Sequence, residues 1–136
     1  MAIEVYINFD GNCREAVTYY AEIFKTEKPN IMTFSDGPQN PDFPIPEEAK
    51  NRVMHTELTI FGSRVMFSDT FPGWNFVQGN NISITIISND TEAITNAFHK
   101  LKEEGKVGMD LQETFWSKLY GTVTDKFGIS WQFSHE

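Results

Sequence analysis

The chain has a single cysteine, Cys13, among 136 residues, and this scarcity excludes an intramolecular disulfide. A lone thiol suits a reducing compartment, so we expect a cytoplasmic protein. Basic residues are also scarce, because 11 Lys and Arg stand against 19 Asp and Glu and give a net charge of −8. This balance argues against a nucleic-acid partner and against an anionic membrane surface, since both attract basic faces.

Long apolar runs and glycine-rich loops are missing as well. No run of about 18 apolar residues occurs, so we expect no segment that spans a bilayer. The first ten residues, MAIEVYINFD, lack the basic and apolar regions of a signal peptide. The nine glycines include no Gly-x-Gly pair, and P-loops, Ser-His-Asp signatures and CxxC pairs are absent too. The sequence therefore predicts no nucleotide-like cofactor.

What remains is ordinary globular composition, with 40% apolar and 14% aromatic residues, 12 of them Phe. A chain of this length buries about two thirds of its surface, so we expect one domain.

The first half predicts the order strand, helix, then three strands. Asn12 followed by Glu15 is typical of a capping box at a helix start. An apolar stripe follows on one helix face: Cys13, Ala16, Val17, Tyr20 and Phe24. The predicted strands are Ile3–Phe9, Asn30–Ser35, Val53–Phe61 and Arg64–Thr70, the last two joined as a hairpin at Gly62-Ser63.

The second half repeats that order. A strand alternates Ile82, Ile84 and Ile86 with polar residues. Asn89 or Asp90 then caps a helix, with Gly105 beyond its end. The apolar face of this helix holds Ile94, Ala97, Phe98 and Leu101. Three strands follow, at Val107–Leu111, Tyr120–Thr124 and Ile129–Phe133, the last two joined by the turn 125–128.

Two segments interrupt the pattern. Ser35–Lys50 holds four of the six prolines and cannot form a central strand, so it is either a lid over a site or a disordered loop. We favour a partial lid, because Phe43 and Ile45 are apolar. Phe71–Asn80 joins the halves and is more aromatic than a solvated linker needs, which favours a role in filling the gap between them.

Two stretches carry a family resemblance: FDGNCREAVTYYAEIF (Phe9–Phe24) and FWSKLYGTVTDKFGISWQFSHE (Phe115–Glu136). They resemble the glyoxalase/bleomycin-resistance/extradiol-dioxygenase superfamily, with the vicinal oxygen chelate fold, and within it PhnB-like proteins, some labelled demethylubiquinone methyltransferase-like. The resemblance implies an α+β fold of two βαβββ modules, forming a curved mixed β-sheet cup with helices outside. The modules would span 1–70 and 80–136, with 71–79 as connector. It also implies a homodimer and a small-molecule ligand.

Strand alternation indicates which side chains face such a cup. Apolar side chains would pack on the helices and the others would face the ligand. The residues on that second face are Glu4, Tyr6, Asn8, His55, Glu57, Thr59, Met66, Ser68, Ser83, Thr85, Ser130, Gln132 and Ser134. The candidate ligand-binding residues are Tyr6, Asn8, Ser68, Ser83 and Gln132, together with Trp116 and Tyr120 of the FWSKLYG motif.

Metal-dependent members of the superfamily use four ligand positions, and the resemblance carries them onto this chain. They fall on Glu4 or Val5, on Phe67 or Ser68, among Asn81, Ile82 and Ser83, and on Gln132. At most one is a carboxylate and none is His, whereas zinc and nickel sites want His, Glu or Cys. We therefore expect no metal site at these positions.

Glu4, His55 and Glu57 form the one His/carboxylate cluster that could serve as a catalytic or alternative metal site. Cys13 is expected in the core, whereas His99 and His135 are expected to be solvated. Three functions stay open: a non-metal small-molecule binding protein, an isomerase or lyase acting at this cluster, and a dimeric scaffold without catalysis.

Overall fold

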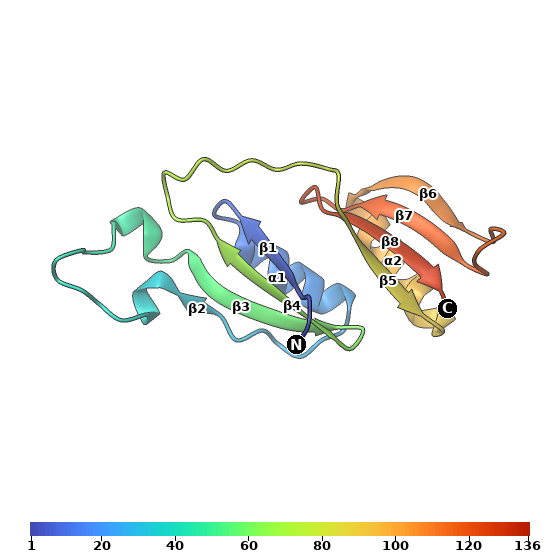
Figure 1. Ribbon diagram of the computed structural model, residues 1–136, viewed down its shortest axis with the longest axis horizontal. Coiled ribbons are helices and arrows are strands. Elements are labelled where there is room, and N and C mark those ends of the chain that lie inside the picture. The colour runs from blue at the N-terminus through green and yellow to red at the C-terminus, as the bar shows by residue number, and fades with distance from the viewer. The chain divides into compact units, whose positions relative to one another are not determined.

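The computed structural model describes all residues from Met1 to Glu136. The chain divides into two compact units, Met1–Val77 and Gln78–Glu136. Each unit is a four-stranded mixed sheet with one helix on one of its faces (Figure 1). The α+β fold with two βαβββ modules, expected from the sequence, is confirmed.

The first unit follows the predicted order of elements. Its sheet has the order β1-β4-β3-β2, in which β1 and β4 are parallel and the other neighbours antiparallel. The elements are β1 (Val5–Phe9), α1 (Cys13–Ile23), β2 (Met32–Thr33), β3 (Val53–Ile60) and β4 (Ser63–Asp69), with short 3-10 turns at Phe34–Asp36 and Glu47–Ala49.

The second unit has the same topology. Its sheet order is β5-β8-β7-β6, with β5 and β8 parallel. The elements are β5 (Ser83–Ser88), α2 (Thr91–Glu104), β6 (Lys106–Gln112), β7 (Tyr120–Thr124) and β8 (Ser130–His135). No helix is long and apolar enough to cross a bilayer.

Aromatic rings join each helix to its sheet. In the first unit Tyr20 of α1 stacks on Phe67 of β4 with ring centroids 5.9 Å apart. In the second, Phe98 of α2 meets Phe133 of β8 edge-on at 5.9 Å. Gly121 of β7 permits this contact, because a Cβ there would lie 3.0 Å from the Phe98 ring. Burial of these apolar faces is the main force that holds each unit together.

Several boundaries and caps differ from the sequence prediction. β1 begins at Val5, so Ile3 lies outside it, and β2 is only two residues long. The capping box at Asn12 is wrong, because its side chain makes no cap hydrogen bond. In α2 the cap is Asp90, whose Oδ1 accepts the backbone N–H of Ala93 at 3.0 Å.

The two interrupting segments contain no strand. Phe43 is 78% exposed, so its role as a lid stays a prediction. Phe71 packs edge-on against Phe34 within the first unit, with centroids 5.4 Å apart, whereas Trp74 is 71% exposed. Of the three aromatic residues in 71–80, Phe71 is therefore anchored, Trp74 is exposed and Phe76 is half-buried.

Candidate functional site

The sheet of the first unit has one face against α1 and one open face. Phe67, Leu58 and Ile60 are buried on the α1 face, and the alternate residues of the same strands lie on the other. The strand register places residues of β1, β4 and β3 side by side on this open face: Tyr6, Asn8, His55, Glu57, Thr59, Met66 and Ser68. Alternation predicted these residues together with Glu4, which precedes the first residue of β1. At the second ligand position the open face carries Ser68, and Phe67 is buried on the α1 face.

A polar chain crosses the open face of the first unit. The hydroxyl of Tyr6 lies 3.3 Å from Nδ1 of His55, and their ring centroids are 5.8 Å apart. On the other side of the imidazole, Nε2 lies 3.6 Å from a carboxylate oxygen of Glu57. A neutral ring protonated at Nε2 can therefore accept from Tyr6 while its N–H points toward Glu57. Imidazole is the side chain best suited to exchange protons near neutral pH.

Arg64 links Glu4, the third predicted catalytic residue, to this row of polar side chains. Its Nε lies 2.5 Å from Glu4, and its Nη1 lies 3.6 Å from Glu57. The hydrogen bond from Arg64 to Glu4 is the main reason that the pKa of Arg64 is raised. The structure thus brings Glu4 and Glu57 together through a guanidinium. Sequence reasoning missed Arg64, although its position opposite Thr59 follows from the hairpin register.

Ser68 and Asn8 form a separate pair on the same open face. The hydroxyl of Ser68 donates to the side-chain oxygen of Asn8 at 3.1 Å, and Ser68 is buried. Both side chains are neutral, so this part of the face can recognise a polar group without adding charge.

A polar cavity of about 540 Å³ adjoins this site at the edge of β3. It lies beyond the short β2, which pairs only with the first part of β3. Its lining residues are Thr26, Glu27, Lys28, Pro29, Asn30, Glu57, Leu58 and Thr59. Glu57 therefore belongs both to the polar chain and to a cavity wall.

The open face of the second unit carries a row of uncharged hydrogen bonds. Tyr120 donates to Oε1 of Gln132 at 2.6 Å, and Nε2 of Gln132 donates to the hydroxyl of Ser83 at 2.8 Å. Trp116 extends the row, since its ring meets Tyr120 edge-on at 5.2 Å and is 53% exposed. Four predicted ligand-binding residues thus lie in one continuous line.

Ser117 anchors the motif that presents Trp116, and sequence reasoning did not single it out. Its buried hydroxyl lies 3.0 Å from the carbonyl oxygen of Leu119 and 3.1 Å from that of His135. The expectation that His135 is solvated is wrong, because Nδ1 of its half-buried ring is inaccessible and lacks a hydrogen-bond partner.

The inherited ligand positions do not fit a transition metal. Glu4 is paired with Arg64, Ser68 donates to Asn8, and both amide atoms of Gln132 are hydrogen-bonded. Hydroxyls and amides are weak ligands for zinc, nickel or iron. No group of three or more His, Cys, Asp or Glu side chains is arranged to hold an ion.

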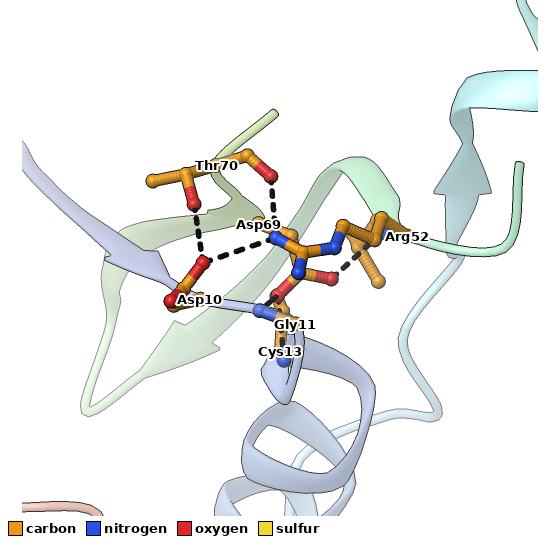
Figure 2. A network of polar contacts seen from close by, with 7 residues as sticks. Asp10, Gly11, Cys13, Arg52, Asp69 and Thr70 are labelled. Carbon is orange, nitrogen blue, oxygen red and sulfur yellow. Dashed lines mark hydrogen bonds and ion pairs between the residues drawn. The ribbon is translucent and has the colours of Figure 1, made fainter. Parts of the chain in front are cut away.

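A second polar network, at the start of α1, is structural (Figure 2). The buried Asp69 accepts the backbone N–H of Gly11 at 2.8 Å, of Cys13 at 3.0 Å and of Val53 at 2.9 Å. It supplies the cap that Asn12 does not, and both of its oxygens accept hydrogen bonds within the protein. Burial, together with the Asp69 charge, raises the pKa of the Cys13 thiol to about 12, which agrees with its predicted place in the core.

Arg52 borders the same network. Its Nη1 donates to the carboxylate of Asp10 at 3.1 Å and to the carbonyl oxygen of Thr70 at 3.0 Å. Hydrogen bonds from Arg52 and from the Thr70 hydroxyl lower the pKa of Asp10. Asp69 and Arg52 therefore both hold the connection between β1 and α1.

Comparison with known proteins gives consistent matches along the whole chain. The sequence model of the family described as 3-demethylubiquinone-9 3-methyltransferase matches residues 1–134. The protein YjdN of Escherichia coli strain K12 is 29% identical over 143 residues, covering 98% of this chain and 95% of that protein.

Solved structures also match the whole chain. Protein PA1353 from Pseudomonas aeruginosa has a TM-score of 0.85 at 30% identity, covering 100% of this chain and 98% of that one. The PhnB protein from Bacillus cereus has a TM-score of 0.74 at 26% identity, with both chains fully covered. A glyoxylase/bleomycin resistance protein/dioxygenase domain from Frankia shares the fold, with a TM-score of 0.66 at 10% identity over 99% and 96% of the chains.

Proposed function

The chain belongs to the 3-demethylubiquinone-9 3-methyltransferase family, the PhnB-like branch of the glyoxalase/bleomycin-resistance superfamily, and we propose that it binds a small molecule without a metal ion. The observation that supports this best is the row from Trp116 through Tyr120 and Gln132 to Ser83. An exposed aromatic ring beside fixed polar groups is the usual composition of a small-molecule site.

The chemistry of this row indicates the kind of ligand. The indole of Trp116 offers an apolar surface, whereas the hydroxyls and the amide offer neutral donors and acceptors. No charged side chain takes part in the row, so an uncharged molecule with an aromatic or apolar part and a few oxygen atoms fits it best. The mutual hydrogen bonds hold Tyr120 and Gln132 in place before a ligand arrives, which lowers the entropy lost on binding.

Native mass spectrometry of tag-free protein tests the proposal. We expect an organic molecule that co-purifies and is released by unfolding. The Tyr120→Phe variant keeps the ring but removes the hydroxyl that donates to Gln132, so retention of this molecule should fall by about tenfold. Tyr19→Phe is the matched control, because Tyr19 lies on α1 of the first unit and takes no part in the row. Equal retention in the two variants would contradict the proposed site.

A second candidate function is acid–base catalysis at the polar chain of the first unit. The contact of His55 with both Tyr6 and Glu57 favours it, because this chain could move a proton across the imidazole. Glu57 also lines the adjoining cavity, where a small oxygenated substrate could sit. If the protein is such an enzyme, it converts the co-purifying molecule, and His55→Gln abolishes this turnover without releasing the molecule. If it only binds the molecule, the wild-type protein shows no turnover.

Methyl transfer is not part of the proposal, although the family description names a methyltransferase. The sequence has no Gly-x-Gly pair, and each sheet is a small mixed one rather than a doubly wound parallel sheet. A nucleotide-like cofactor is usually held by a glycine-rich loop at the end of such a sheet.

We further propose a cytoplasmic homodimer. Large apolar side chains are exposed on both units, among them Trp74, Val77, Ile82, Ile87 and Phe115. Leaving them in water is unfavourable, and a second copy could cover them. Light scattering should report twice the 15.6 kDa chain mass, and a concentration-independent monomer would contradict the dimer.

A further inference from the structure

A groove runs along the flank of α1, away from the open face of its sheet. It has a volume of about 540 Å³ and lies between α1 and the segment that leads to β2. Its lining residues are Arg14, Thr18, Ala21, Glu22, Lys25, Thr26, Lys28, Pro29 and Ile31. The helical members recur at spacings of three or four, so they share one face of α1.

The floor and the rim of this groove differ in chemistry. Ala21, Pro29 and Ile31 are partly or fully buried and give the floor an apolar surface. Arg14, Lys25 and Lys28 are exposed and supply three positive charges at the rim. Such a combination suits a ligand that has an apolar part and a negative group.

The three rim cations make no ion pair within the protein, although the charge of Arg14 adds to the hydrogen bonds from Thr33 that lower the pKa of Asp36. Five other basic residues form ion pairs with carboxylates: Lys50, Arg52, Arg64, Lys102 and Lys126. None of the three rim cations takes part in an ion pair, and Glu22 is the one acidic residue of the lining. In a chain with a net charge of −8, this local excess of positive charge is unusual.

The backbone is strained beside the groove, because Lys25 adopts φ 53 in the left-handed region. It follows the end of α1, where Thr26 N–H bonds the carbonyl of Ala21 at 3.0 Å. Helices that end in this way usually place Gly at that position, since a side chain is disfavoured there. Lys25 places a charged side chain at the groove where glycine would suit the backbone better, and such outliers concentrate at ligand sites.

We propose that this groove is a binding site for a small amphipathic carboxylate. The apolar chain of the ligand lies on Ala21, Pro29 and Ile31, and its carboxylate lies among Arg14, Lys25 and Lys28. Arg14 offers a planar fork of donors that matches a carboxylate, and the two ammonium groups add charge. The groove shares Thr26, Lys28 and Pro29 with the cavity at the edge of β3, but none of its residues belongs to the row from Trp116 to Ser83. This proposal is therefore independent of the binding function proposed above.

An NMR titration of the full chain with sodium octanoate tests the site. Amide signals of α1 and of the segment 25–31 should shift with saturation, and those of the two open faces should not. Octan-1-ol and acetate separate the two contributions, because the first lacks the charge and the second lacks the apolar chain. Each should bind at least about tenfold more weakly than octanoate.

Charge-removing variants complete the test. The double variant Arg14→Gln/Lys28→Gln should weaken octanoate binding by about tenfold. Lys100→Gln/Lys106→Gln removes two exposed, unpaired cations of the second unit and should leave the affinity for octanoate unchanged. Circular dichroism confirms the fold of each variant. Equal affinity in both double variants, or shifts confined to the open faces, would overturn the proposal. So would association with phosphatidylglycerol vesicles without any response to free octanoate.

Discussion

Replacement of Asp69 by asparagine probes the connection between β1 and α1. The carboxylate is 4% exposed and accepts three backbone N–H groups, from Gly11, Cys13 and Val53. Asparagine keeps an oxygen for the first two, as a weaker neutral acceptor. Its NH₂ group then faces the N–H of Val53, so that two donors meet. A hydrogen bond to a charged group contributes about 1.5–3 kcal/mol, and a buried donor without a partner costs about 1–3 kcal/mol.

We therefore expect Asp69→Asn to lower the free energy of unfolding by about 3 kcal/mol. Urea unfolding followed by circular dichroism measures this loss, with an unchanged slope showing that the unfolded state is the same. Hydrogen exchange should accelerate at the amides of Gly11, Cys13 and Val53. Asp10→Asn is the control, because this exposed carboxylate bonds only the Arg52 and Thr70 side chains, and its effect should be far smaller. A loss below about 0.5 kcal/mol in Asp69→Asn would contradict the role of Asp69 as the cap of α1.

Three further outcomes follow from single contacts. Lys25→Gly should raise the free energy of unfolding by about 1 kcal/mol, since it relieves the left-handed backbone at φ 53, whereas Lys28→Gly should give no gain. Cys13, whose pKa is raised to about 12, should not react with a disulfide reagent at about pH 8 until urea unfolds the chain. Trp131→Phe removes the indole N–H that bonds buried Asp125 at 2.8 Å, and should cost about 2 kcal/mol in urea unfolding, whereas Trp116→Phe should cost little.

The sequence predicts both open faces because strands alternate strictly. Once Phe9 and Leu58 are assigned to the helix side, Tyr6, Asn8, His55 and Glu57 must lie on the other. The order of elements and the Asp90 cap of α2 are equally local signals, and the structure has them.

Other parts depend on contacts between distant residues. Asp69 caps α1 across 56 residues of sequence, so nothing near Asn12 indicates the true cap. Arg64 reaches Glu4 across 60 residues, and only the parallel pairing of β1 with β4 brings them together. The left-handed Lys25 has no sequence signal, because glycine is the residue expected at such a position. Sequence reasoning could thus predict which side chains lie on the open faces. It could not predict the hydrogen bonds of Asp69 and Arg64, which join residues far apart in the sequence.

Elemental analysis of tag-free protein tests whether the protein works without a metal ion. We expect no stoichiometric zinc, nickel or iron, because a divalent ion needs three or four strong donors. The inherited ligand positions offer hydroxyls, amides and a carboxylate held by Arg64. One bound metal per chain, lost in His55→Ala, would contradict this expectation. That result would show that Glu4, His55 and Glu57 form a metal centre and would favour an enzyme over a binding protein.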